Sequence, residues 1–466
     1  MTLIKSISGI RGTIGGKSGE NLTPNDIVKF VSAFGYWLKS KSTKNNVVIG
    51  RDARPSGEVV SKIVSATLQS LGLNVIDLGL STTPTVEIAV PLENATGGII
   101  ITASHNPIQW NALKLLNEKG EFISATDGEE ILTLAESDDI QYVDVKKMGA
   151  YTFIEDGYIP KHIEMILKLP LVDVEAIRAK NFKIALDCVN STGGIAVPML
   201  LNALGVKQIT PFFCEPNGWF PHNPEPIPEN LNIICKEIEN GHFDLGIVVD
   251  PDVDRLAMIC EDGTPFGEEY TLVSVADYVL KNQKGNTVSN LSSSRALQDV
   301  TEKNGGEYYF SAVGEVNVVE AMKEYDAVIG GEGNGGVIYP ALHYGRDALV
   351  GIALFLSHLA KFGLSMRRLK ATYPEYHISK NKIELDASVD IDGLFRKIKY
   401  KYNNNPITTI DGVKVIFGKE WVHLRKSNTE PIIRIYAESD SLVTANHLAT
   451  KLMMDIRDLL APHGNL

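Results

Sequence analysis

The segment VVIGRDARPSG, residues 47–57, contains the structural unit from which most of this chain is built. Three β-branched apolar residues, which are typical of a buried strand, run directly into a polar loop. The apolar periodicity that follows predicts a helix ending near Leu71. A strand, a loop and a helix in this order form one unit of a parallel α/β layer. An earlier helix is predicted to begin at Thr23 and Pro24, which supply an N-cap and a first-turn proline.

This order of elements recurs twice further along the chain. Strand 184–186 leads into a helix ending near Leu204, and strand 287–289 leads into a helix ending near Asn304. Each unit continues with a second short strand and then a third strand that ends in a loop rich in polar residues or glycine. These loops span residues 102–107, 250–255 and 330–336. We therefore predict three related α/β domains in series, with ligands bound beyond the carboxyl ends of their strands.

The last hundred residues follow a different pattern. Four short apolar runs predict strands, and the segment from Ser441 to about Leu460 predicts an amphipathic helix. Those runs are 382–385, 413–417, 421–424 and 432–436. The fold class is therefore α/β, with three tandem related domains containing mixed sheets and a smaller C-terminal α+β domain. The predicted domain boundaries are 1–148, 149–260, 261–370 and 371–466.

Composition excludes several classes of protein. The 466 residues include 45 Lys and Arg against 57 Asp and Glu, and the net charge of −12 argues against non-specific nucleic-acid binding. The four cysteines are far apart with no C-x-x-C pair, which indicates free thiols in a reducing compartment. No apolar signal region follows Met1, and the longest apolar patch, 348–356, is about half the length of a membrane-spanning helix. We expect a cytoplasmic protein without a membrane partner.

The loop after the strand 245–249 carries three aspartates, Asp250, Asp252 and Asp254. Alternation by two places these carboxylates on one side of an extended chain, and hard oxygen ligands of this kind suit Mg2+ or Ca2+. An EF-hand is excluded, because Arg255 stands where that loop requires glycine. A solvated acidic turn is the alternative interpretation. Three aspartates with no lysine between them would repel one another without a cation, so metal binding is favoured.

The loop 102–107 contains adjacent Ser104 and His105. A serine hydroxyl is a poor nucleophile unless a base or a metal assists it, and the chain has no G-x-S-x-G elbow around this serine. A simple Asn-Pro turn with Ser104 as a local cap is the alternative interpretation. Spacing alone favours that turn and leaves a catalytic serine open.

Two further loops are suited to ligands. The glycine-rich segment 330–336 is not a dinucleotide fingerprint, because a strand and not a helix follows it. Its glycines could admit a polyol to the side chains of Glu332 and Asn334. The loop 425–430 combines a guanidinium, two hydroxyls and an amide, which suit a phosphate, although a polar hairpin turn has the same composition.

Together with Gly9-Ile-Arg-Gly12, these four loops make the chain resemble the α-D-phosphohexomutases along its whole length. That family comprises phosphoglucomutase, phosphomannomutase and phosphoglucosamine mutase. The resemblance implies three related α/β domains and a smaller fourth domain around a central cleft. It also implies an intramolecular phosphotransferase that uses Mg2+, a phosphosugar substrate, and a hexose 1,6-bisphosphate as activator and intermediate.

The resemblance further implies roles for individual residues. Ser104 is expected to be a phosphoserine whose phosphate oxygen, with Asp250, Asp252 and Asp254, holds Mg2+. Lys114 corresponds to the general acid/base. The remaining candidates surround the phosphoserine (Arg11, His105 and Arg255), bind sugar hydroxyls (Glu332 and Asn334), or grip the non-reacting phosphate (Arg425, Ser427, Asn428 and Thr429, with Arg434 in support).

The sequences Gly-Asn-Gly-Gly at 333–336 and Trp-Asn-Ala-Leu-Lys at 110–114 are most similar to the phosphoglucosamine mutase-type branch, whereas many members have Glu-x-Ser in the sugar loop. Conversion of glucosamine 6-phosphate to glucosamine 1-phosphate is therefore the expected activity, in a monomer or homodimer. A glucose or mannose phosphomutase of broader specificity is the alternative. A phosphatase and a non-catalytic sugar-phosphate-binding regulator are more distant ones.

Overall fold

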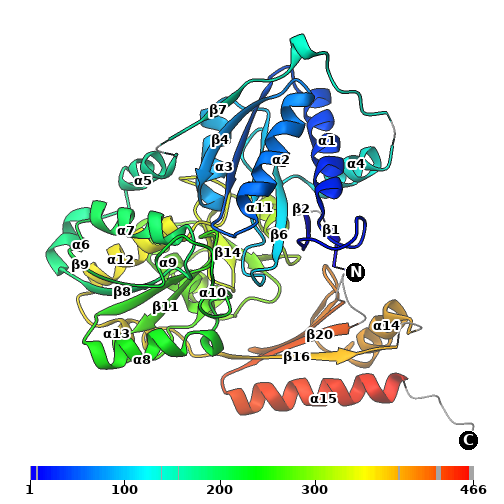
Figure 1. Cartoon of the computed structure of the whole chain (residues 1–466). Coiled ribbons are helices and arrows are strands. Elements are labelled where there is room, and N and C mark those ends of the chain that lie inside the picture. Colours follow the sequence, from blue (N-terminus) through cyan, green and yellow to red (C-terminus); the bar gives the residue numbers. More distant parts are fainter. Residues whose placement is uncertain are drawn as a thin grey trace, which may run out of the picture.

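The computed structural model describes residues 2–6, 9–137, 139–155, 157–386, 389–426 and 432–460. Its strands form four separate sheets, of which three are mixed and the last is antiparallel. In Figure 1 the first sheet and its helices lie at the top, the second and third sheets lie below them, and the C-terminal sheet lies at the bottom.

The first domain is built on a seven-stranded sheet with the order β1-β2-β6-β5-β3-β4-β7. Strand β7 lies beyond residue 148 and still pairs with β4, so the first sheet extends past the boundary expected there. The strands are β1 (Ile4–Ser6), β2 (Gly9–Thr13), β3 (Asn46–Arg51), β4 (Asn74–Leu80), β5 (Gly97–Ile101), β6 (Trp110–Leu116) and β7 (Tyr151–Phe153). The helices are α1 (Pro24–Lys41), α2 (Gly57–Ser70), α3 (Thr83–Leu92) and α4 (Ala125–Ala135), with a 3-10 turn at Val145–Lys147.

The next two domains each contain a four-stranded sheet, in the orders β11-β10-β8-β9 and β13-β12-β14-β15. The strands are β8 (Lys183–Asp187), β9 (Gln208–Phe212), β10 (Leu245–Val249), β11 (Leu256–Cys260), β12 (Asn286–Asn290), β13 (Tyr308–Ser311), β14 (Ala327–Glu332) and β15 (Gly336–Ile338). The helices are α5 (Ile159–Leu167), α6 (Val174–Lys180), α7 (Gly193–Ala203), α8 (Asn232–Gly241), α9 (Glu268–Asn282), α10 (Ala296–Lys303), α11 (Glu315–Glu324), α12 (Ala348–Phe362) and α13 (Met366–Lys370), with a 3-10 turn at Pro228–Asn230.

The predicted threefold repeat is confirmed by the strand pairing. In each domain the first strand of the unit lies between its second and third strands and is parallel to both, and an antiparallel strand then pairs with the third. The serine loop (102–107), the metal loop (250–255) and the sugar loop (330–336) therefore occupy one equivalent position, between the third strand and its antiparallel partner. This position is the carboxyl end of a parallel strand, where ligands bind in α/β sheets.

The C-terminal domain has a five-stranded antiparallel sheet in the order β16-β20-β19-β18-β17. All four predicted strands and the final helix are present, and β16 begins five residues before its predicted start because its half-exposed first residues lack an apolar pattern. The elements are β16 (His377–Glu384), α14 (Ile391–Lys401), β17 (Ile407–Thr408), β18 (Val413–Phe417), β19 (Glu420–Lys426), β20 (Ile432–Ser439) and α15 (Leu442–Leu460).

The second and third domains share one continuous hydrophobic core. The apolar patch 348–356 lies in α12 at the centre of this core, where Phe355 packs edge-to-face on Phe266 with ring centroids 5.5 Å apart. Within the described parts of the chain, no helix combines the length and the apolar character needed to cross a membrane. The four cysteines are free thiols, as predicted.

Candidate active site

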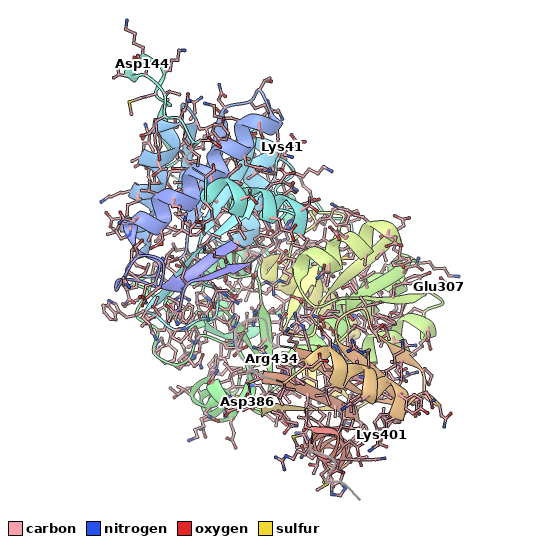
Figure 2. The ribbon with its side chains drawn as sticks, turned by 90° about the vertical axis from the view of Figure 1, so that its right-hand side faces the viewer. Lys41, Asp144, Glu307, Asp386, Lys401 and Arg434 are labelled. Carbon is pink, nitrogen blue, oxygen red and sulfur yellow. The ribbon has the colours of Figure 1, made fainter. Side chains whose placement is uncertain are left out.

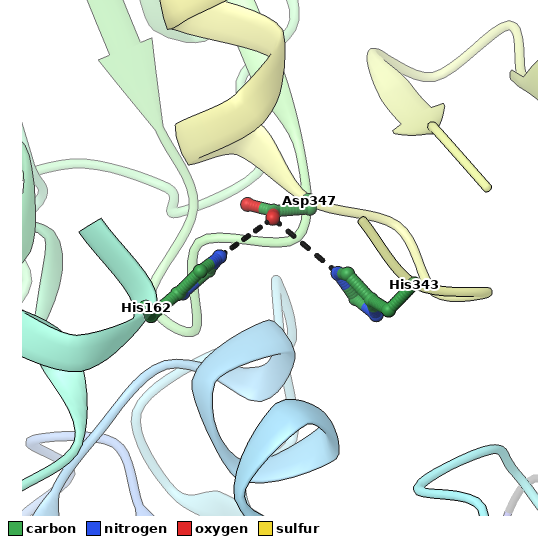
Figure 3. Close-up of side chains that lie close together, drawn as sticks. All are labelled: His162, His343 and Asp347. Carbon is green, nitrogen blue, oxygen red and sulfur yellow. Dashed lines mark hydrogen bonds and ion pairs between the residues drawn. The ribbon is translucent and has the colours of Figure 1, made fainter. Parts of the chain in front are cut away.

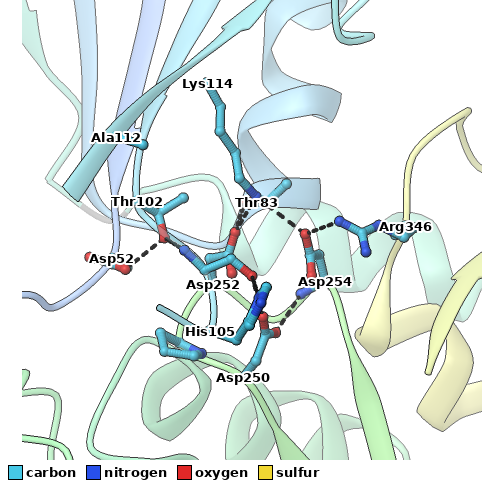
Figure 4. Close-up of polar contacts among 12 residues, drawn as sticks. Asp52, Thr83, Thr102, His105, Ala112, Lys114, Asp250, Asp252, Asp254 and Arg346 are labelled. Atoms are coloured by element: carbon cyan, nitrogen blue, oxygen red, sulfur yellow. Dashed lines mark hydrogen bonds and ion pairs between the residues drawn. The ribbon is translucent and has the colours of Figure 1, made fainter. Parts of the chain in front are cut away.

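The serine loop (102–107) and the metal loop (250–255) lie against each other, and Figure 4 shows His105 of the first beside Asp250 of the second. The Ser104 Oγ donates a hydrogen bond of 2.8 Å to Asp250 Oδ2, although the two residues belong to different domains and are 146 positions apart. Ser104 is only 7% exposed. The first two domains thus place a serine hydroxyl directly on a buried carboxylate.

The backbone of Ser104 has a left-handed conformation, with φ of 48°. This conformation costs a residue other than glycine about 1–3 kcal/mol and persists only where the surroundings impose it. The Ser104 N–H donates to Thr102 Oγ1 at 2.9 Å, and the Thr102 hydroxyl donates to Asp52 Oδ2 at 2.6 Å. The loop after β3 therefore holds the serine loop in place.

Arg54 is the second support of the serine loop, and the sequence analysis did not identify it. Its fully buried guanidinium pairs with Asp52 at 3.0 Å. It also donates to four backbone carbonyl oxygens, those of Ser104 (2.5 Å), Asn106 (2.6 Å), Pro107 (2.7 Å) and Trp110 (3.0 Å). Its position just after a parallel strand was the one available signal, because functional loops follow such strands.

The three aspartates of the metal loop form one buried cluster whose ligand atoms lie within 4.8 Å of one another. Asp250 Oδ1 accepts the backbone N–H groups of Asp254 and Arg255 at 3.2 and 3.1 Å. Among the described residues, Asp252 Oδ1 and Asp254 Oδ1 are buried without a hydrogen-bond partner. Burial and the neighbouring carboxylates raise the pKa of Asp250 well above its usual value. Unsatisfied buried carboxylate oxygens are costly, so this cluster fits a hard divalent cation.

Lys114 on β6 contacts the same cluster from the first domain. Its Nζ donates to Asp252 Oδ2 at 2.7 Å and to Asp254 Oδ2 at 3.2 Å, which leaves the Oδ1 atoms of both aspartates free for a cation. Burial alone would lower the pKa of Lys114, but the two carboxylates outweigh it and raise that pKa. Thr83 at the start of α3 donates a further hydrogen bond, of 2.5 Å, to Asp252 Oδ2.

His105 contacts Ser104, and the charges of Arg255 and Arg11 act on His105. His105 Nδ1 lies 3.3 Å from the Ser104 Oγ, and burial together with the nearby Arg255 lowers the pKa of His105, so that its imidazole is neutral. Arg11 lies on β2, beside β6, and its pKa is lowered by burial and by the like charge of Arg434. Figure 2 shows Arg434 where the C-terminal domain meets the rest of the molecule. Arginines of two domains thus approach each other here.

The sugar loop is joined to the metal loop by Arg346, which the sequence analysis also missed. The Arg346 guanidinium lies 2.8 Å from Asp254 Oδ2, 2.9 Å from Glu315 Oε2 and 3.1 Å from Glu332 Oε2. Glu332 Oε1 in turn accepts hydrogen bonds from the side chain of Asn290 at 2.8 Å and the backbone of Gly314 at 3.3 Å. Nothing in the sequence around Arg346 indicates this role, because its three partners are distant in the chain.

The other predicted substrate-binding residues are partly described. The side-chain oxygen of Asn334 accepts the Gly336 N–H at 3.2 Å, within the sugar loop itself. Arg425 and Arg434 are opposite each other on β19 and β20, and Arg425 pairs with Asp411 at 2.8 Å. Asp411 also accepts the backbone N–H of Val313, which belongs to the third domain. The remaining phosphate-loop candidates lie outside the described residues: Ser427, Asn428 and Thr429.

Comparison with known proteins gives matches along the whole chain. The family descriptions are phosphoglucomutase/phosphomannomutase alpha/beta/alpha domain I at residues 3–141, domain II at 160–263 and domain III at 267–376, and the C-terminal domain at 380–454.

The chain is 36% identical to a phosphoglucomutase/phosphomannomutase of Thermococcus kodakarensis over 92% of this chain and 94% of the relative. It is 32% identical to a phosphoglucosamine/phosphogalactosamine mutase of Sulfurisphaera tokodaii over 95% of this chain and 97% of the relative. Among solved structures, a phosphoglucomutase/phosphomannomutase family protein of Burkholderia thailandensis shares the fold with a TM-score of 0.83 at 23% identity, over 99% and 98% of the two chains. The chain therefore belongs to the phosphoglucomutase/phosphomannomutase family, the α-D-phosphohexomutases, which are intramolecular phosphotransferases of the isomerase class.

Proposed function

We propose that this enzyme interconverts glucosamine 6-phosphate and glucosamine 1-phosphate, with Ser104 as the carrier of the phosphoryl group. The observation that carries the mechanism is the 2.8 Å hydrogen bond from the Ser104 hydroxyl to Asp250, inside a buried cluster that also contains Lys114. A buried serine held by an acidic cluster is suited to accept and release phosphate, because a bound divalent cation offsets the charge of the transferring group.

In the first half of the reaction, the bond between the Ser104 oxygen and phosphorus breaks, and a new bond forms to the free hydroxyl oxygen of the sugar phosphate. The hydroxyl proton leaves the sugar and the Ser104 oxygen regains a proton. Lys114 is proposed to relay it, by giving its own proton to the Ser104 oxygen as it accepts the proton of the sugar. Asp250, Asp252 and Asp254, with a phosphate oxygen on Ser104, would hold Mg2+. Arg11 and Arg255 contribute positive charge near the phosphate.

The second half of the reaction requires the bisphosphorylated sugar to reverse its orientation, so that its other phosphate returns to Ser104. Arg425, Ser427, Asn428 and Thr429, supported by Arg434, are proposed to grip whichever phosphate is not reacting. Glu332 and Asn334 are proposed to bind sugar hydroxyls. Water would compete with the sugar as acceptor, so the site must be closed during transfer.

Two observations bear on the sugar. The sugar loop reads Glu332-Gly333-Asn334 where many family members have Glu-x-Ser, and the relative from Sulfurisphaera tokodaii is named for amino-sugar phosphates. These support glucosamine phosphate. The relative from Thermococcus kodakarensis is more similar in sequence and is named for glucose and mannose phosphates, which favours a broader phosphomutase as the second candidate.

A 31P NMR time course tests the proposal. The protein is mixed with Mg2+ and a trace of glucose 1,6-bisphosphate, and glucosamine 6-phosphate, glucose 6-phosphate and mannose 6-phosphate are supplied in parallel. Fastest formation of the 1-phosphate from the amino sugar is the expected result. Faster conversion of glucose or mannose phosphate would overturn the substrate and keep the mechanism. Release of inorganic phosphate alone would refute the mutase.

A further inference from the structure

A second cluster of metal-ligand side chains lies outside the site described above (Figure 3). His162 comes from α5, whereas His343 and Asp347 come from the loop that joins β15 to α12. The Nε2 atoms of both imidazoles face the same oxygen, Asp347 Oδ2, at 2.9 Å for His162 and 3.3 Å for His343. The side chains of His162 and Asp347 are completely buried. These three residues come together although His162 and Asp347 are 185 positions apart.

The spacing of these atoms suits a tetrahedral metal ion. Zinc binds histidine nitrogen at about 2.0–2.1 Å and carboxylate oxygen at about 2.0–2.2 Å, so neighbouring ligand atoms of a tetrahedral zinc site lie about 3.3 Å apart. The observed separations of 2.9 and 3.3 Å are close to this value, and all three ligand atoms lie within 4.8 Å of one another. The other oxygen of Asp347 caps α12 by accepting the N–H groups of Leu349 and Val350, which fixes the carboxylate in this orientation.

Each histidine is also oriented from behind. Thr85 Oγ1 lies 3.0 Å from His162 Nδ1, and Glu87 Oε2 lies 3.5 Å from His343 Nδ1. In metal sites the nitrogen that does not bind the ion usually contacts a carboxylate or another oxygen, which fixes the ring and makes it a stronger ligand. The structure therefore contains both the ligands and the groups that support them.

Glu87 provides an independent indication that a positive charge belongs here. It is 2% exposed, and among the described residues neither of its carboxylate oxygens has a hydrogen-bond partner. An unsatisfied buried carboxylate is expensive, and a cation bound to His343 would offset that cost. Gly345 lets the Glu87 carboxylate approach the loop that carries His343, since a Cβ atom at position 345 would lie 2.0 Å from Glu87 Oε2.

We propose that His162, His343 and Asp347 form a second metal site, which binds Zn2+ and is distinct from the aspartate cluster beside Ser104. Imidazole ligands favour zinc over magnesium, whereas the three aspartates offer only oxygen. A pocket of about 90 Å3 is lined in part by Glu87 and His343, so it reaches one of the three proposed ligands, whereas His162 and Asp347 do not line it.

The site would connect α5 to the loop that carries Arg346. Arg346 precedes the ligand Asp347 in the chain, and its guanidinium contacts Asp254 of the metal loop and Glu332 of the sugar loop. An ion held by Asp347 would thus fix the backbone beside Arg346. Without the ion, the same residues form a histidine–aspartate–histidine hydrogen-bond network.

Metal binding to the full-length protein distinguishes these two states. The protein is stripped with a chelator, returned to buffer with saturating Mg2+ to occupy the aspartate cluster, and titrated with Zn2+ against a chromophoric chelator. We expect one equivalent of tightly bound zinc. Co2+ added instead should give the intense visible absorption of a four-coordinate site. Absence of tight zinc binding in the wild-type protein would overturn the proposal.

Variants assign the ion to its ligands. His343→Gln should abolish tight binding, and Glu87→Gln should weaken it about 10–100-fold. His358→Gln is the matched control, because His358 is also a buried histidine near an aspartate, with its Nε2 3.7 Å from Asp277, and this variant should bind zinc normally. Zinc binding that survives His343→Gln but is lost in Asp252→Asn would place the ion on the aspartate cluster and refute the second site. The Co2+ spectrum of the wild-type protein does not depend on how the variants fold.

Discussion

Replacing Arg54 with alanine should disable the enzyme and destabilise its first domain. The guanidinium of Arg54 neutralises the buried Asp52 and donates to four backbone carbonyls of the serine loop. Burial raises the pKa of Asp52, and the positive charge of the Arg54 guanidinium opposes this effect. Removing one member of a buried ion pair costs about 3–5 kcal/mol, because the remaining charge is left uncompensated.

The effect on turnover follows from the backbone of Ser104. Its left-handed φ of 48° is held by contacts that include the Arg54 hydrogen bond to the Ser104 carbonyl. A displacement of about 1 Å at a reacting group can cost about 100-fold in rate, so we expect at least that loss of kcat in Arg54→Ala. The kcat of Arg54→Lys should lie between those of the wild type and Arg54→Ala, since one ammonium group cannot replace the guanidinium's planar set of donors.

Urea unfolding and mutase kinetics measured on the same preparations test this reasoning. Arg51→Ala is the matched control, because Arg51 is half-buried and, among the described hydrogen bonds, its side chain donates only to the Asp52 carbonyl, at 3.2 Å. We expect the control to lose less than about 1 kcal/mol and to keep its turnover. If Arg54→Ala behaved like Arg51→Ala in both assays, the assigned support of the serine loop would be wrong.

Three other predictions concern the metal, the sugar loop and pH. Asp252→Asn should raise the Mg2+ concentration for half-maximal activity at least about tenfold, since a carboxylate ligand is lost. An unchanged Mg2+ response would show that Asp252 does not bind the metal. Arg346→Lys should lower kcat about tenfold or more, because lysine cannot contact Asp254 and Glu332 as the fork of arginine does; kinetics equal to the wild type would contradict this bridging role. Burial lowers the pKa of His423 to about 4, whereas in the unfolded chain this imidazole takes up a proton near pH 6.5. The free energy of unfolding should therefore fall as pH drops from about 6.5 towards 4, by up to about 3 kcal/mol. Urea unfolding at several pH values should show a smaller loss in His423→Gln, and an identical profile would assign the effect to other groups.

The elements that the sequence predicted best are those with a regular burial pattern. Strands such as β3, β8 and β12 are almost entirely buried after their first residue, and each is followed by a polar loop and a helix, so their places in the repeat could be predicted. Strand β7 could not be assigned, because its three residues are exposed and it is defined by its partner β4. The early start of β16 was missed for another reason, since the residues before Lys382 contain no apolar run.

In the candidate site, too, some residues could be predicted from the sequence and others could not. The aspartates stood out as a local motif, whereas the role of Ser104 followed from the resemblance to the family, and the structure brings these residues together. Arg54 and Arg346 carry no motif, since Arg54 binds backbone carbonyls about fifty positions away and Arg346 binds carboxylates from three separate segments. Residues that support a site through distant partners leave no periodic pattern in the sequence, and only the folded chain reveals them.

Transfer of phosphate through Ser104 is the central claim, and intact-protein mass spectrometry tests it directly. The protein is incubated with glucose 1,6-bisphosphate and Mg2+, desalted, and then mixed with glucosamine 6-phosphate. We expect the gain of one phosphoryl group, its location on Ser104 by peptide mapping, and its loss to the sugar phosphate in the second step, with no gain in Ser104→Ala. A Ser104→Ala variant that still took up the phosphoryl group, or that turned over substrate at a near-normal rate, would contradict the account.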